Sequence, residues 1–191
     1  MICGLILAAG EGTRFGPEPK LLADLDGRPL LEHAIRAQCA VPELRRVVVV
    51  LGAHADQLRE RVDFMRAEPV DCDDWREGQA ASLRAGLREL PGASKVLVTL
   101  GDQPLITSEL VTRFVAEPPG SRALYGGRPG HPVVLGPEHV RALMSVTGDR
   151  GARDLLRGGN EIEVSGLVDL GLDVDTLEDL EAIRHEARAN V

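Results

Sequence analysis

Leu5-Ile6-Leu7-Ala8-Ala9-Gly10-Glu11-Gly12-Thr13-Arg14-Phe15-Gly16, which runs on to Lys20, decides how the rest of this chain is interpreted. The apolar run at its start is typical of a buried strand, and it ends in a turn with three glycines. Gly10 and Gly12 allow backbone angles that other residues avoid, and a close approach to a ligand. Successive N–H groups in such a turn bind anions, and Arg14 and Lys20 add two cations. The stretch therefore predicts a cradle for a polyphosphate.

The glycine spacing separates this turn from two familiar phosphate loops. Gly10, Gly12 and Gly16 follow the pattern G-x-G-x-x-x-G, which is one residue off the dinucleotide-binding fingerprint. No Gly-Lys-Ser/Thr follows, so the turn is not the loop of P-loop NTPases. The alternative interpretation is a glycine-rich connection between a strand and a helix, with two cations at the surface.

Length and composition favour one globular domain over residues 1–191. The net charge of −8 argues against a general nucleic-acid binder, although local cations can still hold a small anion. The longest apolar runs, such as Val47 to Leu51, are too short to cross a bilayer. No basic segment precedes an apolar core at the N-terminus, and the three cysteines are widely spaced. We therefore expect a cytoplasmic protein with reduced thiols and no membrane partner.

Apolar periodicity predicts strands that alternate with helices through the first two thirds of the chain. We expect strands at 2–8, 47–51, 68–72 and 95–100, and helices at 30–38, 56–62, 83–90 and 108–114. This order predicts a parallel sheet with helices on both faces. The remainder is less regular, with expected strands at 122–125, 133–135, 162–164 and 167–170, a loop at 126–132, and helices at 137–144, within 148–159 and from 176.

Carboxylates follow two of the predicted strands. Ligands of open parallel sheets bind beyond the carboxyl ends of the strands, where the glycine turn, Asp102, Asp173 and Asp175 all fall. Magnesium is typically held by one or two carboxylates together with phosphate oxygens. Asp102 is the first candidate ligand and Asp173 the second. As alternatives, Asp102 can cap a helix or form an Asx-turn, and Asp175 can stabilise the N-terminus of the final helix.

Three further residues are candidates with open alternatives. Gly78 to Ser82 is a second glycine turn that opens a helix, and Ser82 can bond a base or phosphate, or cap the helix. Trp75 can stack on a flat ring or serve as a covered surface aromatic. His131 lies in a glycine-rich segment, and we do not assign it as a general base.

The order of these motifs resembles the nucleotidyltransferases of the molybdenum-cofactor type, over nearly the whole chain. The matching segments are Leu7-Ala8-Ala9-Gly10-x-x-x-Arg14-x-Gly16 with Lys20, Gly78-x-x-x-Ser82-Leu83-x-x-Gly86, Gly101-Asp102-Gln103-Pro104, Gly130-His131-Pro132, Gly148-Asp149-Arg150-Gly151-Ala152-Arg153, and Asp173-Val174-Asp175-Thr176-x-Glu178-Asp179-Leu180. The resemblance implies a Rossmann-like, three-layer α/β/α fold with a mostly parallel sheet, of the nucleotide-diphospho-sugar transferase type.

The resemblance also implies a set of site residues. Those implied to bind the nucleotide are Leu7, Ala8, Ala9, Gly10, Gly12, Thr13, Arg14, Lys20, Gly78 and Ser82. Catalytic roles are implied for Arg14, Lys20 and Asp102, and Mg²⁺ binding for Asp102 and Asp173. Contacts to the acceptor are implied for His131, Arg150 and Asp175.

Within the family, Leu-Ala-Ala-Gly resembles the cytidylyltransferases, whereas guanylyltransferases tend to have Leu-Ala-Gly-Gly. The resemblance thus implies Mg²⁺-dependent transfer of CMP from CTP to the phosphate of molybdenum-loaded molybdopterin, with release of pyrophosphate and transient contact with a molybdoenzyme or its chaperone. Phe15 departs from the usual Met, and Pro17-Glu18-Pro19 precedes Lys20. Three alternatives stay open: a guanylyltransferase or another enzyme with a different phosphorylated acceptor, a non-catalytic carrier of a nucleotide or pterin cofactor, and a partner-binding domain.

Overall fold

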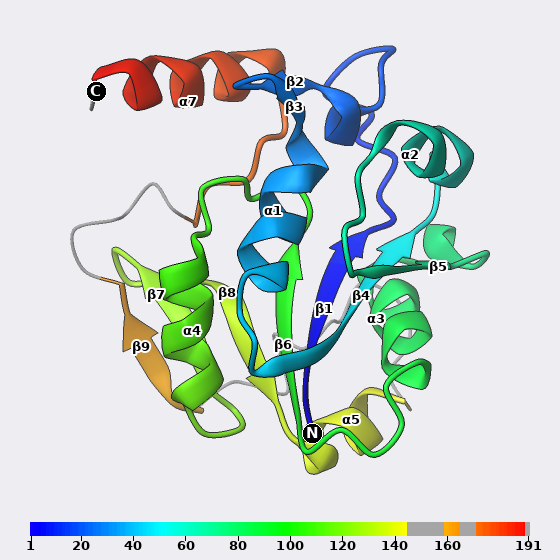
Figure 1. Cartoon of the computed structure of the whole chain (residues 1–191), viewed down its shortest axis with the longest axis vertical. Coiled ribbons are helices and arrows are strands. Elements are labelled where there is room, and N and C mark those ends of the chain that lie inside the picture. The colour runs from blue at the N-terminus through cyan, green and yellow to red at the C-terminus, as the bar shows by residue number, and fades with distance from the viewer. Residues whose placement is uncertain (145–158, 165–170, 190–191) are drawn as a thin grey trace.

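A computed structural model describes residues 1–144, 159–164 and 171–189 of this chain (Figure 1). The strands of its main sheet are β1 (Ile2–Ala8), β4 (Leu44–Leu51), β5 (Glu68–Asp71), β6 (Lys95–Leu100), β7 (Arg122–Tyr125), β8 (Arg128–Leu135) and β9 (Glu161–Glu163). A small ribbon is formed by β2 (Asp24–Leu25) and β3 (Arg28–Pro29). The helices are α1 (Leu30–Cys39), α2 (Ala55–Arg61), α3 (Gln79–Arg88), α4 (Ser108–Ala116), α5 (Pro137–Leu143) and α7 (Leu177–Ala189), with 3-10 turns η1 (Lys20–Leu22) and η2 (Trp75–Glu77).

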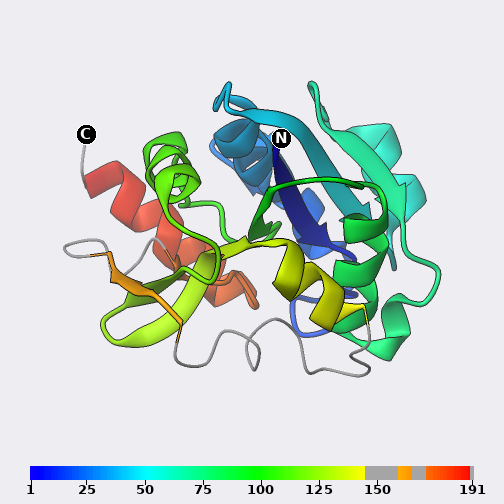
Figure 2. The same cartoon turned by 90° about the horizontal axis from the view of Figure 1, so that it is seen from below.

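The main sheet confirms the predicted fold class. Its strand order is β5-β4-β1-β6-β8-β7-β9, and β1, β4, β5 and β6 pair in parallel. Strand β8 pairs antiparallel with both of its neighbours, so the sheet is mostly rather than wholly parallel. Helices α1, α2 and α4 lie on one face of the sheet, and α3 and α5 lie on the other (Figure 2). Their apolar side chains join the core clusters on those two faces. The three-layer α/β/α arrangement follows.

Strand β1 lies at the centre of this architecture because both of its faces are apolar. Its residues after Ile2 are buried, which suits a parallel strand that is covered on each side by helices. On one side α3 approaches closely, since a Cβ on Gly86 would lie 2.3 Å from Leu5 Cδ1 and 2.7 Å from Val50 Cγ2. Only a residue without a side chain allows that distance, so Gly86 lets the C-terminal half of α3 pack directly on the middle of β1.

Threonine side chains cap two of the helix N-termini. The Thr107 side chain accepts a hydrogen bond from the backbone N–H of Leu110 at the start of α4. Thr176 and Asp179 form a capping box before α7, with Thr176 N–H donating to Asp179 Oδ2 and Asp179 N–H donating to Thr176 Oγ1. These caps fix where both helices begin, next to the carboxyl ends of the parallel strands.

The predicted loop at 126–132 is wrong, because residues 128–132 belong to β8. Gly126 and Gly127 have φ values of 56° and 75° and make a two-residue turn, across which Tyr125 pairs with Arg128. Two glycines are a strong hairpin signal, but the prolines that follow disguise the strand. Strand β4 also begins three residues before the predicted start, where Leu44 pairs with Ile2. The predicted strand at 167–170 and the helix predicted within 148–159 lie outside the described residues, apart from Gly159.

The C-terminal segment is tied to the glycine turn by a separate apolar cluster. Its members are Phe15, Leu25, Leu30, Val174, Leu180 and Ile183. The backbone N–H of Val174 also donates to Asp102 O at 2.9 Å. Asp173 and Asp175 flank Val174, so this packing holds both carboxylates beside the end of β6. No helix in the described ranges is long and apolar enough to cross a membrane.

Candidate active site

The glycine turn leaves β1 at the carboxyl edge of the sheet, where the sequence places it. Gly12 has φ +65° and Gly16 has φ +124°, so both take conformations that side chains disfavour. The N–H of Phe15 donates to Gly12 O at 3.0 Å, which closes a tight turn between them. Gly10 differs from our expectation, because its φ is not positive; a Cβ there would meet nothing within 4 Å. Its contribution is open space rather than an unusual backbone angle.

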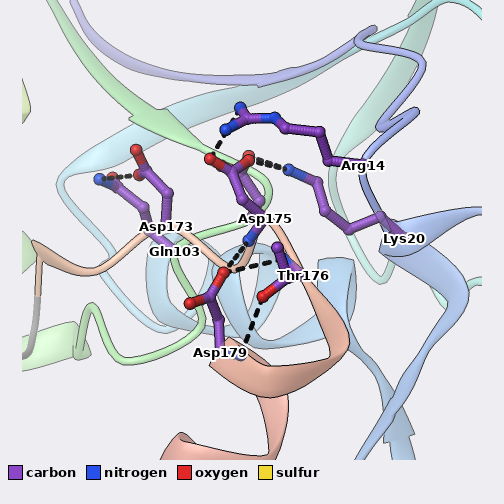
Figure 3. A network of polar contacts seen from close by, with 8 residues as sticks. Arg14, Lys20, Gln103, Asp173, Asp175, Thr176 and Asp179 are labelled. Carbon is purple, nitrogen blue, oxygen red and sulfur yellow. Dashed lines mark hydrogen bonds and ion pairs between the residues drawn. The ribbon is translucent and has the colours of Figure 1, made fainter. Parts of the chain in front are cut away.

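Lys20 and Arg14 converge on carboxylates from distant parts of the chain (Figure 3). Lys20 Nζ lies 2.7 Å from Asp102 Oδ2 and 3.1 Å from Asp175 Oδ1. Arg14 Nη2 lies 2.8 Å from Asp175 Oδ2. Asp175 therefore bridges the two cations of the turn, one with each oxygen. Burial alone would lower the pKa of Lys20, but its interactions with Asp102 and Asp175 outweigh that effect and raise the pKa. Its charge is thus secured in the folded protein.

Asp173 is held by a different partner. Gln103 Nε2 donates to Asp173 Oδ1 at 2.8 Å and to Gly171 O at 3.2 Å. Although part of Asp173 is open to solvent, the surrounding protein displaces water from its carboxyl group, and the charge of Asp102 adds repulsion. Together these effects raise the pKa of Asp173 to about 6, against the opposing hydrogen bond from Gln103. Asp173 and Asp102 are therefore close enough for their charges to interact.

Two adjoining cavities open at this edge of the sheet. One, of about 340 Å³, is lined by Leu7, Ala9, Gly10, Glu11, Trp75, Arg76, Gly78, Gln79, Ser82, Leu100 and Asp102. The other, of about 250 Å³, is lined by Leu7, Gln79, Leu83, Val98, Leu100, Gln103, Arg122, Pro129, Gly130, His131, Val133, Gly171 and Asp173. Leu7, Gln79 and Leu100 contribute to both walls. We call them the Ser82 cavity and the His131 cavity.

The cavities divide the predicted site residues into groups. Leu7, Ala9, Gly10, Gly78, Ser82 and Asp102 line the Ser82 cavity. Ala8 instead packs into the core on the face of the sheet that α1, α2 and α4 cover, and it lines neither cavity. Thr13 is exposed, and Gly12 packs against the Lys20 side chain. His131 lines the other cavity, whose walls do not include Asp175, and Arg150 lies outside the described residues.

The second glycine turn is formed as predicted. Gly78 has φ +102° and precedes the first residue of α3. Ser82 is buried inside α3 and does not cap it, which removes the structural alternative that the sequence left open. Trp75 lies at the rim with the Arg76 guanidinium 4.2 Å from its ring centroid, so one face of the indole is already covered by a cation.

Sequence reasoning missed three polar residues of the site. Gln79 separates the two cavities, and Gln103, which is 2% exposed, orients Asp173. Arg122 lines the His131 cavity from β7, with Nε donating to Glu161 Oε1 at 3.1 Å. Gln103 was quoted within a motif, but its partner could not be known. A buried arginine in a short strand gives no local signal, because only the sheet order places it beside the cavity.

The donor set at this edge fits a hard divalent cation. Asp102 and Asp173 both present carboxylate oxygens, and their mutual repulsion is part of what raises the pKa of Asp173. Oxygen ligands at such a site suit Mg²⁺ or Mn²⁺ rather than a soft metal. No larger cluster of His, Cys, Asp and Glu suited to a metal occurs among the described residues. A cation here would therefore depend on phosphate oxygens or water for its remaining ligands.

The glycine turn and its two cations lie opposite carboxylates at the carboxyl edge of a mostly parallel sheet. This arrangement is typical of α/β proteins that bind nucleotides. The chain belongs to the MobA-like NTP transferase domain family, whose model matches residues 4–164. By class it is a nucleotidyltransferase.

Individual relatives differ in what their names state. Nicotine blue oxidoreductase from Paenarthrobacter nicotinovorans is 36% identical to this chain over an alignment of 198 positions, gaps included, which covers 94% of each protein. The chain also matches the bifunctional protein GlmU of Kineococcus radiotolerans, at 41% identity over 58% of this chain, but spans only 23% of that protein's length. Among solved structures, Rv0371c from Mycobacterium tuberculosis H37Rv superposes with a TM-score of 0.84 at 27% identity, covering 96% and 97% of the two chains. Rv0371c has also been solved in complex with manganese.

Proposed function

We propose that this chain transfers CMP from CTP to the phosphate of molybdenum-loaded molybdopterin and releases pyrophosphate. The observation that carries the proposal is the convergence of Arg14 and Lys20 on Asp102 and Asp175, beside two adjoining cavities. Cations for a triphosphate and carboxylates for its metal ion lie within one network. Two substrates can therefore meet at Leu7, Gln79 and Leu100, which both cavities share.

The Ser82 cavity is proposed to take the nucleotide. It lies against the glycine turn through Ala9 and Gly10, so a triphosphate can reach Arg14 and Lys20 while the base extends toward α3. Gly78 leaves backbone groups accessible at the start of that helix, and Ser82 offers a hydroxyl within the cavity. The CTP preference is inferred from Leu-Ala-Ala-Gly in the turn, because Ala9 stands where guanylyltransferases tend to have glycine.

The His131 cavity is proposed to take the acceptor. Its walls combine apolar side chains with Gln103, Arg122 and His131, which suits a partly flat, polar-edged molecule such as a pterin. Arg122 supplies a guanidinium whose side chain is 9% exposed, and a phosphate on the acceptor is a suitable partner for it. We assign the proposed acceptor contacts to His131 and, through its nearness to the cations, to Asp175. Arg150 keeps that role as a prediction.

The proposed reaction is an in-line displacement at phosphorus. An oxygen of the acceptor phosphate forms a bond to the α-phosphorus of CTP, and the bond from that phosphorus to the bridging oxygen of the β-phosphate breaks. Pyrophosphate leaves with the electron pair. The attacking oxygen is already anionic, so no strong general base is needed. Arg14 and Lys20 would neutralise the triphosphate and the leaving group, and alignment with charge neutralisation supplies the catalysis.

Mg²⁺ would be held by Asp102 and Asp173, and when bound it would polarise the α-phosphate. We propose that the product passes onward by transient contact with a molybdoenzyme or its chaperone in the cytoplasm. The experiment is pyrophosphate release with Mg²⁺ and molybdenum-loaded molybdopterin, with CTP and GTP compared at equal concentration. Release with CTP alone supports the proposal. Release with GTP alone would overturn the cytidylyl assignment, and binding without turnover would favour a different acceptor or a carrier role.

A redox activity is a second candidate, because the relative from Paenarthrobacter nicotinovorans covers nearly the whole chain and is named as an oxidoreductase. The same preparation can be tested for oxidation of NADH and NADPH in the presence of an organic dye as electron acceptor. Asp102→Asn separates the two activities. Metal-assisted nucleotidyl transfer requires that carboxylate, whereas hydride transfer from a dinucleotide does not need a metal ion.

A further inference from the structure

The proposed metal ligand Asp102 is engaged by the proposed phosphate ligand Lys20. Lys20 Nζ donates to Asp102 Oδ2 at 2.7 Å, so the lysine already neutralises the carboxylate that a cation would need. We infer that Lys20 occupies Asp102 until a nucleoside triphosphate draws it away, so that the divalent cation binds well only together with the nucleotide. This inference rests on the proposed function and adds an order of binding to it.

The lysine is a packed part of the site and not a loose surface cation. Its side chain is 10% exposed. A Cβ on Gly12 would lie 3.1 Å from Lys20 Cβ and 3.6 Å from its Cε, so the glycine turn rests directly on the lysine stem. The turn and the amine therefore form one unit. A ligand that binds to the turn is placed to act on Lys20 as well.

Asp175 would compete with a triphosphate for the two cations Lys20 and Arg14. Its Oδ1 accepts from Lys20 at 3.1 Å and its Oδ2 pairs with Arg14 at 2.8 Å (Figure 3). A carboxylate between two cations resembles one phosphate group in charge and in the spacing of its oxygens. The Arg14 side chain is 73% exposed and can reach an incoming anion first. A triphosphate that displaces Asp175 then gains Lys20, and Asp102 loses its cation.

The consequence is a coupling between two ligands at one site. A divalent cation that meets the nucleotide-free protein must compete with an amine held at hydrogen-bond distance from Asp102. A cation that arrives with a triphosphate finds Lys20 engaged by phosphate oxygens and Asp102 available. Because coupling is reciprocal, the cation strengthens binding of the triphosphate by the factor by which the triphosphate strengthens binding of the cation.

The test is a titration of the nucleotide-free full chain with Mn²⁺, followed by electron paramagnetic resonance. Wild-type protein is expected to bind Mn²⁺ weakly, and Lys20→Met is expected to bind it roughly tenfold more tightly, within the usual range of coupling between sites. Lys20→Gln is the second variant, because its amide keeps the packing under Gly12 without the charge. Both are checked for cooperative thermal unfolding before titration.

Lys95→Met is the matched control. Its amine donates to the backbone carbonyls of Val115 and Glu117, at the other end of β6. Either loss of lysine changes the net charge from −8 to −9, so general attraction of cations rises equally in both variants. The double variant Lys20→Met with Asp102→Asn should lose the increase in Mn²⁺ affinity, which would locate the bound Mn²⁺ at Asp102.

The outcomes separate this inference from the proposed function. If Lys20→Met and Lys20→Gln bind Mn²⁺ no more tightly than wild type, Lys20 does not hold the place of the cation and the inference is overturned, even where CTP is turned over. If both variants bind Mn²⁺ more tightly while the wild-type protein turns over neither CTP nor GTP, the occupancy of Asp102 by Lys20 stands and the proposed reaction fails. Strong Mn²⁺ binding by nucleotide-free wild type would also overturn the inference.

Discussion

Lys20 Nζ donates a hydrogen bond to Asp102 Oδ2 at 2.7 Å, although 82 positions separate the two residues in the sequence. The sheet makes this contact. Strands β1 and β6 are parallel neighbours in register, with Leu7 opposite Leu100, so the segments that follow them leave the sheet side by side. The glycine turn carries Lys20 along one path, and Gly101 leads directly to Asp102 on the other. A cation and a carboxylate from two motifs thus become one ion pair.

Asp102→Asn is expected to lower turnover far more than it lowers stability. The substitution keeps the side-chain volume but removes the charge that we propose holds the metal ion, and loss of one preorganised electrostatic contact typically costs about 10² to 10³ in kcat. Asp175 remains as a partner for Lys20, so the folded state keeps one of the two ion pairs. Pyrophosphate release and urea unfolding measured on the same preparation check this. A stability loss that matches the activity loss would count against a metal-binding role.

Asp175→Asn tests whether this carboxylate competes with the triphosphate. An asparagine keeps a hydrogen-bonding oxygen but no longer pairs electrostatically with Arg14 and Lys20. We therefore expect CTP to bind several-fold more tightly in the absence of metal, in line with the modest value of partly exposed ion pairs. The dissociation constant of CTP, measured at equilibrium with EDTA present, checks this expectation. Asp71→Asn, which breaks the surface pair with Arg59, is the control. Weaker CTP binding by Asp175→Asn would mean that Asp175 positions the cations rather than blocking them.

Thr107→Ala is expected to lower stability without a change in chemistry. The Thr107 hydroxyl oxygen accepts from the Leu110 N–H at 3.3 Å and caps α4, outside both cavities. Loss of an N-cap typically costs about 1 kcal/mol. Urea unfolding measures the loss, and pyrophosphate release at saturating CTP should stay at the wild-type rate. Thr107→Ser keeps the hydroxyl and should restore stability. A large fall in kcat would show that α4 helps to shape the site.

The sheet and its caps were predictable from the sequence because their signals are local. Apolar runs identify β1 and β6, and Thr107 and Thr176 each lie at the expected distance before an apolar stripe. The reversal of β8 was not predictable in the same way. Its prolines weaken the strand signal, and its partners β6 and β7 are known only when the sheet is assembled.

The candidate site was predictable in its residues but not in its pairing. The motifs placed Arg14, Lys20, Asp102, Asp173 and Asp175 at one sheet edge, and the structure places them there. That Lys20 contacts Asp102 while Gln103 orients Asp173 depends on side-chain packing between segments distant in sequence. The apolar cluster around Val174 holds the backbone that carries Asp173 and Asp175, and no spacing rule encodes that packing.

Asp173 gives the site a pH dependence with a defined sign. Its pKa in the folded protein is about 6, whereas an unperturbed aspartate titrates near 3.9. Between those values the folded state binds more protons than the unfolded state, so the contribution of Asp173 to stability falls as pH rises through this window. At the proposed metal site, binding of a divalent cation would follow the opposite course, because it would require the ionised carboxylate of Asp173.

We therefore expect the Mn²⁺ affinity of the chain, measured with CTP present, to rise as pH increases from 5 to 7, with a midpoint near the pKa of about 6. Asp173→Asn should remove that midpoint and weaken the binding at pH 7. It should also flatten the pH dependence of the urea midpoint between about pH 4 and 6, since no proton is then taken up on folding at this position. Because Gln103 donates to Asp173, Gln103→Leu should move the midpoint to higher pH, as loss of a hydrogen bond to the charged form raises the pKa. A midpoint that persists unchanged in Asp173→Asn would assign the titration to another group and remove Asp173 from the proposed metal site.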